Sequence, residues 1–180
     1  EAVDGNYYLG RREAAFGDGT GVTAISNYAL APDSRPSVSG DGSTAVFVSS
    51  AHDLIVAETN GAGSLALGLT GLVHSASISA DAKHVVIIFR NPDTGLPIDQ
   101  IAYIDIESDS SVLIPLYLPV ADGGTALKIR TVDEIDLSPD GQTAIFDGLA
   151  ETTLANGLTL RSWSIFAVDL RTRQILSLAG

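Results

Sequence analysis

The chain has 180 residues, of which 45% are hydrophobic, and its 22 acidic and 10 basic side chains give a formal net charge of −12. A charge this negative removes any general attraction for nucleic acid or for an anionic membrane surface, and the apolar content excludes a disordered acidic tail. The chain contains no cysteine, which excludes disulfides, thiolate metal sites and a cysteine nucleophile.

The chain begins with Glu1 and contains no methionine, so we expect a processed chain or a piece of a longer one. No run of 18 apolar residues occurs, which predicts that no segment spans a membrane. Few charges and 18 glycines are typical of an exported bacterial protein. We therefore expect an extracellular, periplasmic or cell-surface location.

The first 35 residues lack the repeated unit described below. Residues 7–12 and 22–26 are predicted to form outer strands of a partial blade. Within the first of these, Tyr7 and Tyr8 point to opposite faces of a strand, which leaves one ring exposed. Together with Arg11 and Arg12, two of the few positive charges, they form a candidate partner surface. A plain outer-edge strand is the alternative.

Three later segments share one pattern, which is a short apolar strand, Ser-x-Asp followed by Gly or Ala, a polar pair and a second apolar strand. They are residues 36–47, 76–87 and 135–146. Asp-Gly between two such runs predicts a tight hairpin, because glycine accepts a positive φ and aspartate bonds nearby backbone amides. The continuous apolar run of residues 85–89 indicates a strand that is buried on both faces.

Each unit is followed by two further predicted strands in the second and third repeats. Third strands are expected at residues 99–106 and 163–170, and fourth strands at 112–116 and 174–178. Trp163 begins an apolar third strand in this reading, which favours a place in the core.

The repeats predict an all-β, propeller-like array of about three to four antiparallel blades of four strands, forming an incomplete ring. We place a partial blade or partner-contacting strands at 1–35, a shortened first blade at 36–75, a second blade with an inserted loop at 76–134 and a third at 135–180. A closed four-bladed ring is a less favoured alternative. An open array exposes strand edges and a bare apolar face, which promotes association.

The recurring Ser-x-Asp-Gly unit, together with residues 49–61, resembles the TolB-like, WD-repeat-like β-propeller repeats of exported bacterial proteins. The resemblance implies a propeller fold and protein–protein interaction in or outside the cell envelope. Two positions depart from the family pattern: Ala82 replaces the turn glycine, and Asp147 stands where the strand normally continues.

Catalytic candidates are few. His52, His74 and His84 are the only histidines, and none lies in a metal-binding or catalytic motif. We assign no catalytic and no cofactor-binding residue. A secreted hydrolase or lyase remains an alternative function, with the catalytic domain outside these residues or with His52 and His84 meeting in one channel.

Acidic side chains at residues 133–136 raise the question of calcium, which takes oxygen ligands. Strand alternation would put Glu134 and Asp136 on one face and Asp133 on the other. Glu134 and Asp136 are therefore weak candidate ligands of a calcium ion. The aspartates of the repeats are better explained as turn formers.

The sequence predicts a non-enzymatic extracellular or envelope protein-interaction module. Its partners are expected to be proteins, foremost copies of itself joined through exposed strand edges into an oligomer or filament. The remaining alternative is a carbohydrate-binding module that uses Trp163 and the tyrosines.

Overall fold

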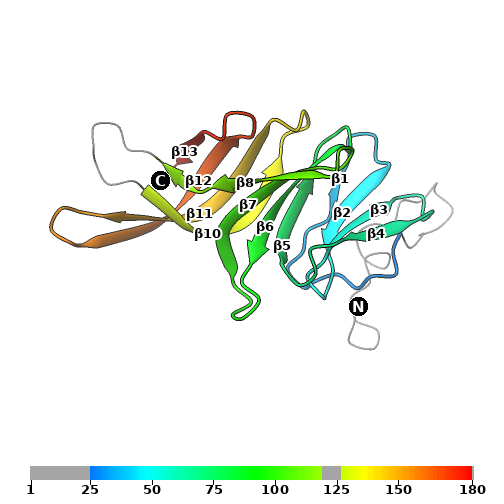
Figure 1. Cartoon of the computed structure of the whole chain (residues 1–180), viewed down its shortest axis with the longest axis horizontal. Helices are drawn as coiled ribbons and strands as arrows, with labels where there is room; N and C mark the ends of the chain where they lie inside the picture. Colours follow the sequence, from blue (N-terminus) through cyan, green and yellow to red (C-terminus); the bar gives the residue numbers. More distant parts are fainter. Residues whose placement is uncertain (1–24, 119–126, 180) are drawn as a thin grey trace.

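A computed structural model of the chain describes residues 25–118 and 127–179. Within these residues all regular structure is β-strand, arranged as three antiparallel sheets (Figure 1). The predicted all-β fold with an open array of blade-like sheets is confirmed. Among the same residues, none forms a helix with the length and apolarity needed to cross a bilayer.

Strands follow one another as neighbours in each of the first two sheets. The first sheet contains β1 (Ser37–Val38), β2 (Thr44–Val48), β3 (Leu54–Glu58) and β4 (Ser64–Leu67). The second contains β5 (Val73–Ile78), β6 (His84–Arg90), β7 (Pro97–Asp105) and β8 (Ser110–Pro115). The first sheet thus has all four strands, although its fourth strand is short.

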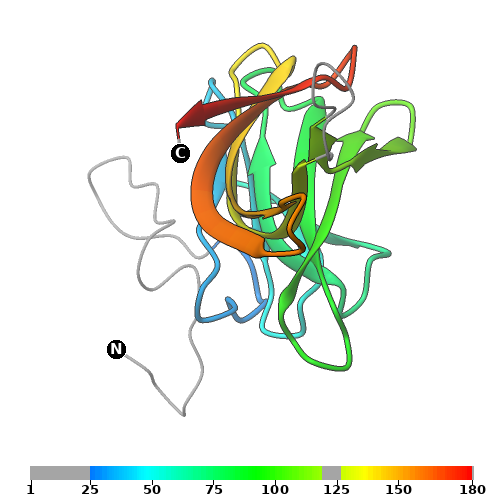
Figure 2. The same ribbon diagram turned by 90° about the vertical axis from the view of Figure 1, so that its left-hand side faces the viewer.

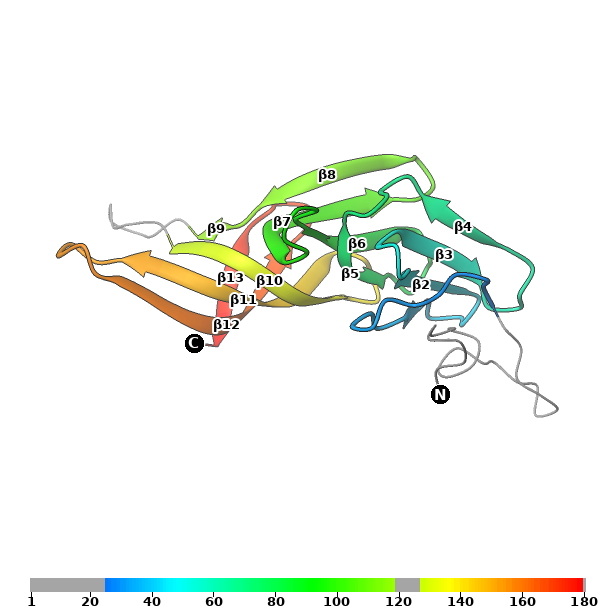
Figure 3. The same cartoon turned by 90° about the horizontal axis from the view of Figure 1, so that it is seen from below.

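The third sheet has five strands in the order β13-β12-β11-β10-β9. They are β9 (Tyr117–Leu118), β10 (Leu127–Leu137), β11 (Thr143–Thr153), β12 (Thr159–Asp169) and β13 (Ile175–Ala179). Strands β11 and β12 have 11 residues each, whereas β2 and β3 have five. The extra length makes a hairpin arm that projects from the end of the molecule (Figures 1 and 3).

The Ser-x-Asp unit forms the same hydrogen-bonded turn in all three sheets. In the second sheet, the Ser79 hydroxyl donates to Asp81 Oδ1 at 2.6 Å and accepts the His84 N–H at 3.0 Å, while Asp81 Oδ1 also accepts the Lys83 N–H at 3.0 Å. Ala82 adopts a φ of 59°, close to the 69° of the equivalent Gly141. The turn conformation is therefore kept even where alanine replaces glycine.

The second sheet is packed on both of its faces, as the apolar run of residues 85–89 predicts. Val85 and Ile87 of β6 lie in the core shared with the first sheet, whereas Val86 and Ile88 lie in the core shared with the third. All four are fully buried. The first and third sheets thus pack on opposite faces of the second, with their outer faces pointing away from it.

The innermost strands of the three sheets are linked by serine side chains. The Ile78 N–H donates to Ser37 Oγ at 3.2 Å, and the Leu137 N–H donates to Ser77 Oγ at 3.0 Å. Each inner strand therefore supplies an acceptor to the next one along the chain. Asp136 occupies the equivalent position in the third repeat.

The second sheet and strand β10 both begin earlier in the sequence than the predicted blade boundaries. The second sheet begins at Val73 rather than at residue 76, and β10 begins at Leu127 rather than at residue 135. The strand predicted at residues 7–12 lies outside the described residues. Ile25 and Leu30 pack against the first sheet, on the face that points away from the second sheet.

Candidate functional site

The outer face of the third sheet includes positions that are buried in the other two sheets. Val46 of β2 and Val86 of β6 are 0% exposed, and the equivalent residue of β11, Ile145, is 48% exposed. Leu54, Ile101 and Ile165 are equivalent as well. They pair in register with Val48, Ile88 and Asp147, which occupy the same position in the three repeats.

Leu54 and Ile101 are also 0% exposed, whereas Ile165 is 46% exposed. In the first two sheets these positions are covered by the next sheet along the chain. In the third sheet nothing among the described residues covers them. Figure 2 looks onto this end of the molecule, with β12 in front and the other sheets behind.

Trp163 belongs to this outer face. Its exposed fraction is 54%, so the expected place in the core is wrong for this residue. It pairs in register with Leu149 of β11 and lies two residues before Ile165, so all three side chains lie on one face of the sheet. Leu176 of β13 extends this face at the level of Ala167. We call Ile145, Leu149, Trp163, Ile165 and Leu176 the outer apolar face.

Two carboxylates interrupt the outer apolar face near the turn end of the sheet. Asp136 pairs in register with Ile145, and Asp147 pairs with Ile165. Asp147 occupies the position of Val48 and Ile88 and accepts the Glu134 N–H at 2.8 Å. No ion pair is formed by Asp136 or Asp147 with any other described residue.

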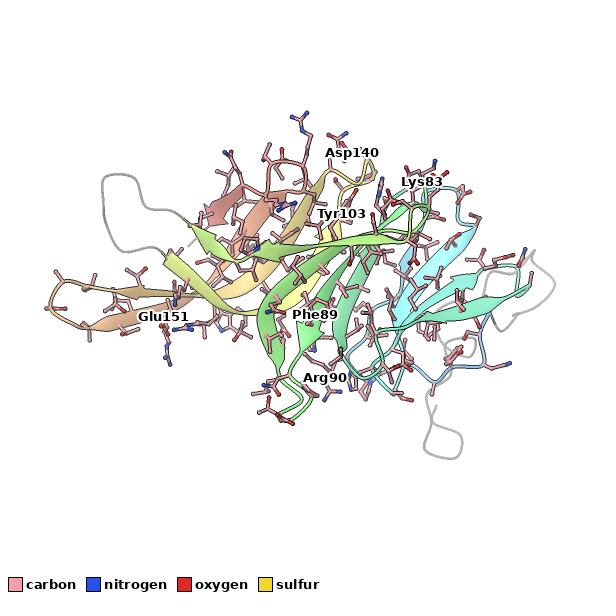
Figure 4. All side chains as sticks on the ribbon, in the orientation of Figure 1. Lys83, Phe89, Arg90, Tyr103, Asp140 and Glu151 are labelled. Carbon is pink, nitrogen blue, oxygen red and sulfur yellow. The ribbon has the colours of Figure 1, made fainter. Side chains whose placement is uncertain are left out.

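Positive charge collects at the opposite end of the same face, at the base of the hairpin arm. Glu151 of β11 accepts hydrogen bonds from Arg130 at 3.1 Å and from Arg161 at 2.9 Å (Figure 4 labels Glu151). Hydrogen bonds from Arg130 and then Arg161 lower the pKa of Glu151. Two guanidinium groups share one carboxylate, so this end of the face carries a net positive charge.

A polar cleft of about 480 Å³ lies where residues 32–35 meet the beginning of β5 and the middle of β10. His74 Nε2 lies 3.1 Å from Asp133 Oδ1, and Arg35 Nε lies 3.4 Å from Glu134 Oε1. Burial raises the pKa of Glu134, and the charges of Asp133 and Asp147 add to this effect while Arg35 opposes it. Arg35 and His74 thus each lie beside an acidic side chain of β10.

The three acidic residues at 133–136 are arranged differently from strict strand alternation. A bulge lies between Val132 and Ile135, so these two residues, three apart, are both buried in the same core. Asp133 and Glu134 consequently both line the polar cleft, whereas Asp136 is on the outer face of the sheet. Within the described parts of the chain, no three His, Cys, Asp or Glu side chains are grouped to hold a metal ion. The calcium site at Glu134 and Asp136 stays a prediction.

His52 and His84 lie near opposite ends of β5. His52 Nδ1 lies 3.2 Å from the Val73 carbonyl oxygen at the beginning of β5, whereas the His84 N–H bonds Ser79 just beyond its end. Figure 4 shows the same separation, because Lys83 and Arg90 lie at opposite ends of β6. Burial and then the charge of Arg90 lower the pKa of His52. The two histidines therefore do not meet in one channel.

Tyr103 stacks on His84 with 5.2 Å between ring centroids, so it does not join Trp163 in a platform. The candidate partner surface of Tyr7, Tyr8, Arg11 and Arg12 lies outside the described residues and stays a prediction. The sequence predicts a bare apolar face but not which residues form it, and the one signal for its place is Asp147 in an otherwise apolar strand.

No family model matches the chain, and no curated protein matches it either. Solved structures match its fold. The β-propeller domain of the Trilobed protease from Pyrococcus furiosus aligns with a TM-score of 0.52 and 11% identity over 81% of this chain and 42% of that chain. The tricorn protease aligns with a TM-score of 0.55 and 12% identity over 90% of this chain and 14% of that one.

The Cps50 (Swd1) β-propeller domain of Myceliophteria thermophila aligns with a TM-score of 0.51 and 15% identity, covering 81% of this chain and 43% of that chain. The chain therefore spans less than half the length of each of these three structures. At these identities the similarity shows the fold, which is that of β-propeller domains.

Proposed function

We propose that the chain is a non-enzymatic protein-interaction module of the cell envelope or the extracellular space, and that the outer apolar face is its binding surface. The observation that carries this proposal is the change in exposure at equivalent positions. Val46 and Val86 are buried by the next sheet, whereas Ile145 is 48% exposed. A contiguous apolar sheet face left open in this way is typical of a protein contact.

The composition of the face favours a protein, rather than a sugar, as the molecule that binds there. Tryptophan and arginine are enriched among the residues that dominate protein interfaces, and here Trp163 and Arg161 are two residues apart on one strand. A sugar site would need polar groups around the indole ring. Trp163 is instead flanked by the apolar Leu149 and Ile165, and its one charged neighbour along the strand, Arg161, is engaged by Glu151.

Resemblance to TolB-like repeats and the composition support the proposed location outside the cytoplasm. If the chain is part of a larger hydrolase, the same face would receive the catalytic domain of that protein.

The test replaces Ile165 by lysine. Lysine at this position lies opposite Asp147 in the register, so a cross-strand charge pair supports the fold while the face loses its apolar centre. The matched control is Leu113→Lys, because Leu113 of β8 is 59% exposed but belongs to the second sheet.

The three immobilised proteins are exposed to secreted and envelope proteins of the native host. We expect the wild type and Leu113→Lys to retain the same proteins and Ile165→Lys to lose them. Equal retention by all three proteins, or no retention by the wild type, would contradict the proposed surface.

A further inference from the structure

Whatever covers the outer apolar face has to satisfy two requirements. It must present apolar side chains to Ile145, Trp163 and Ile165, and it must bring positive charge to Asp136, because Asp147 already accepts the Glu134 N–H. A buried carboxylate without a partner costs several kcal/mol, so an all-apolar sheet is a poor match for this face.

The opposite end of a second copy does not meet these requirements. The outer face of the first sheet is already covered, because Phe47 and Ile55 are 0% exposed and pack in a cluster with Ile25. A second copy thus has no open sheet face at that end on which the third sheet could stack. Head-to-tail stacking of sheet faces, which would extend into a filament, is disfavoured by this arrangement.

The same face of a second copy, turned around, meets both requirements. Along the sheet, carboxylates lie at the turn end near Ile145, and the two arginines lie at the arm end beyond Trp163. When two such faces meet in antiparallel orientation, the arginine end of each lies over the carboxylate end of the other. The apolar residues in the middle then face each other.

We propose that two copies of this chain pair through their outer apolar faces about a two-fold axis that passes close to Trp163 and Ile165. Arg161 of each copy lies over Asp136 of the other. This inference rests on the proposed function, because it names the partner of the same surface. The pair is closed, since each face is used once.

The first experiment measures the mass of the purified chain by sedimentation over a wide concentration range. We expect a reversible monomer–dimer equilibrium that shifts to monomer in Ile165→Lys but not in Leu113→Lys. A wild-type chain that stays monomeric at its highest soluble concentration overturns the two-fold pair. The proposed function would survive that result if the face still binds another protein, as tested above.

The second experiment tests the orientation by charge reversal. In Arg161→Glu, two like-charge contacts replace two attractive ones in the pair, and the same is true of Asp136→Arg. Each variant alone is expected to dimerise at least about tenfold more weakly than the wild type. Both residues are exposed, and thermal unfolding verifies that each variant still folds.

An equimolar mixture of Arg161→Glu and Asp136→Arg is the decisive sample. In the mixed pair, the glutamate introduced at position 161 of one copy faces the arginine introduced at position 136 of the other. At the second contact the unchanged Asp136 faces the unchanged Arg161, so both contacts are attractive again. We expect the mixture to form heterodimers with close to wild-type affinity. A mixture that associates no better than either variant alone overturns the antiparallel orientation.

Discussion

The Ser79 hydroxyl holds the turn of the second sheet together from a fully buried position. It donates to Asp81 and accepts the His84 N–H, so its removal leaves a partly buried amide without its acceptor. We predict that Ser79→Ala lowers the free energy of unfolding by about 1–3 kcal/mol, as measured by urea denaturation.

The control for this prediction is Ser110→Ala. Ser110 is exposed, and its hydroxyl meets the hydroxyl of Ser108 at 2.8 Å. The loss there should stay within about 0.5 kcal/mol. Equal losses at the two positions would mean that the turn bond contributes nothing particular to stability.

Asp41 makes the equivalent turn of the first sheet sensitive to acid. The Ser43 N–H, followed by the hydroxyls of Ser39 and Ser43, lowers the pKa of Asp41 from 3.8 to about 2. Because the folded state depresses this pKa, the contribution of Asp41 to stability is complete above pH 3.8 and is lost as the pH falls to about 2. We predict that the unfolding free energy of Asp41→Asn falls less steeply with pH across this window than that of the wild type. Identical slopes would refute the role assigned to the carboxylate.

At the scale of single elements, the turns of the first and third sheets differ in what surrounds their glycine. Gly42 has a φ of 73° and open space where a Cβ would lie. Gly141 has a φ of 69°, and a Cβ there would lie 2.7 Å from Cδ2 of His84. His84 is held by its stacking on Tyr103, so it cannot simply move aside.

We predict that Gly42→Ala costs about 1 kcal/mol, from the positive φ alone, and that Gly141→Ala costs at least about 1 kcal/mol more. Thermal or urea unfolding of both variants measures the difference. In a His84→Ala background the two substitutions should cost the same. A difference that persists there would show that the contact between the sheets is not its cause.

The repeated hairpins could be predicted from sequence because the Ser-x-Asp unit determines its own turn. Two features of the third sheet could not. The bulge between Val132 and Ile135 leaves no mark in an alternating pattern, so Asp133 could not be placed beside Glu134. Trp163 lies in an apolar strand, and such a strand looks the same whether its second face is covered or open. Whether the second face of the strand is covered depends only on the position of the sheet in the array.

At the scale of the whole molecule, the three sheets form an array of which, among the described residues, one end is covered and the other is open. Ile25 and Leu30 cover the outer face of the first sheet, whereas the outer apolar face of the third sheet is exposed. Fully burying an isoleucine side chain contributes roughly 1.5–3 kcal/mol, and Ile145 and Ile165 are 48% and 46% exposed, so covering each of them contributes about 1 kcal/mol. The open end is therefore where binding is expected.

The chain carries a single tryptophan, and that residue lies in the outer apolar face. The most direct test of the account is therefore the quenching of Trp163 fluorescence by acrylamide as the protein concentration is raised. We predict that quenching decreases and the emission shifts to shorter wavelength in the wild type and in Leu113→Lys, but not in Ile165→Lys. Emission from a Trp163 that stays equally accessible at every concentration, and also after the addition of the proteins that the chain retains, would contradict the claim that this face is a binding surface.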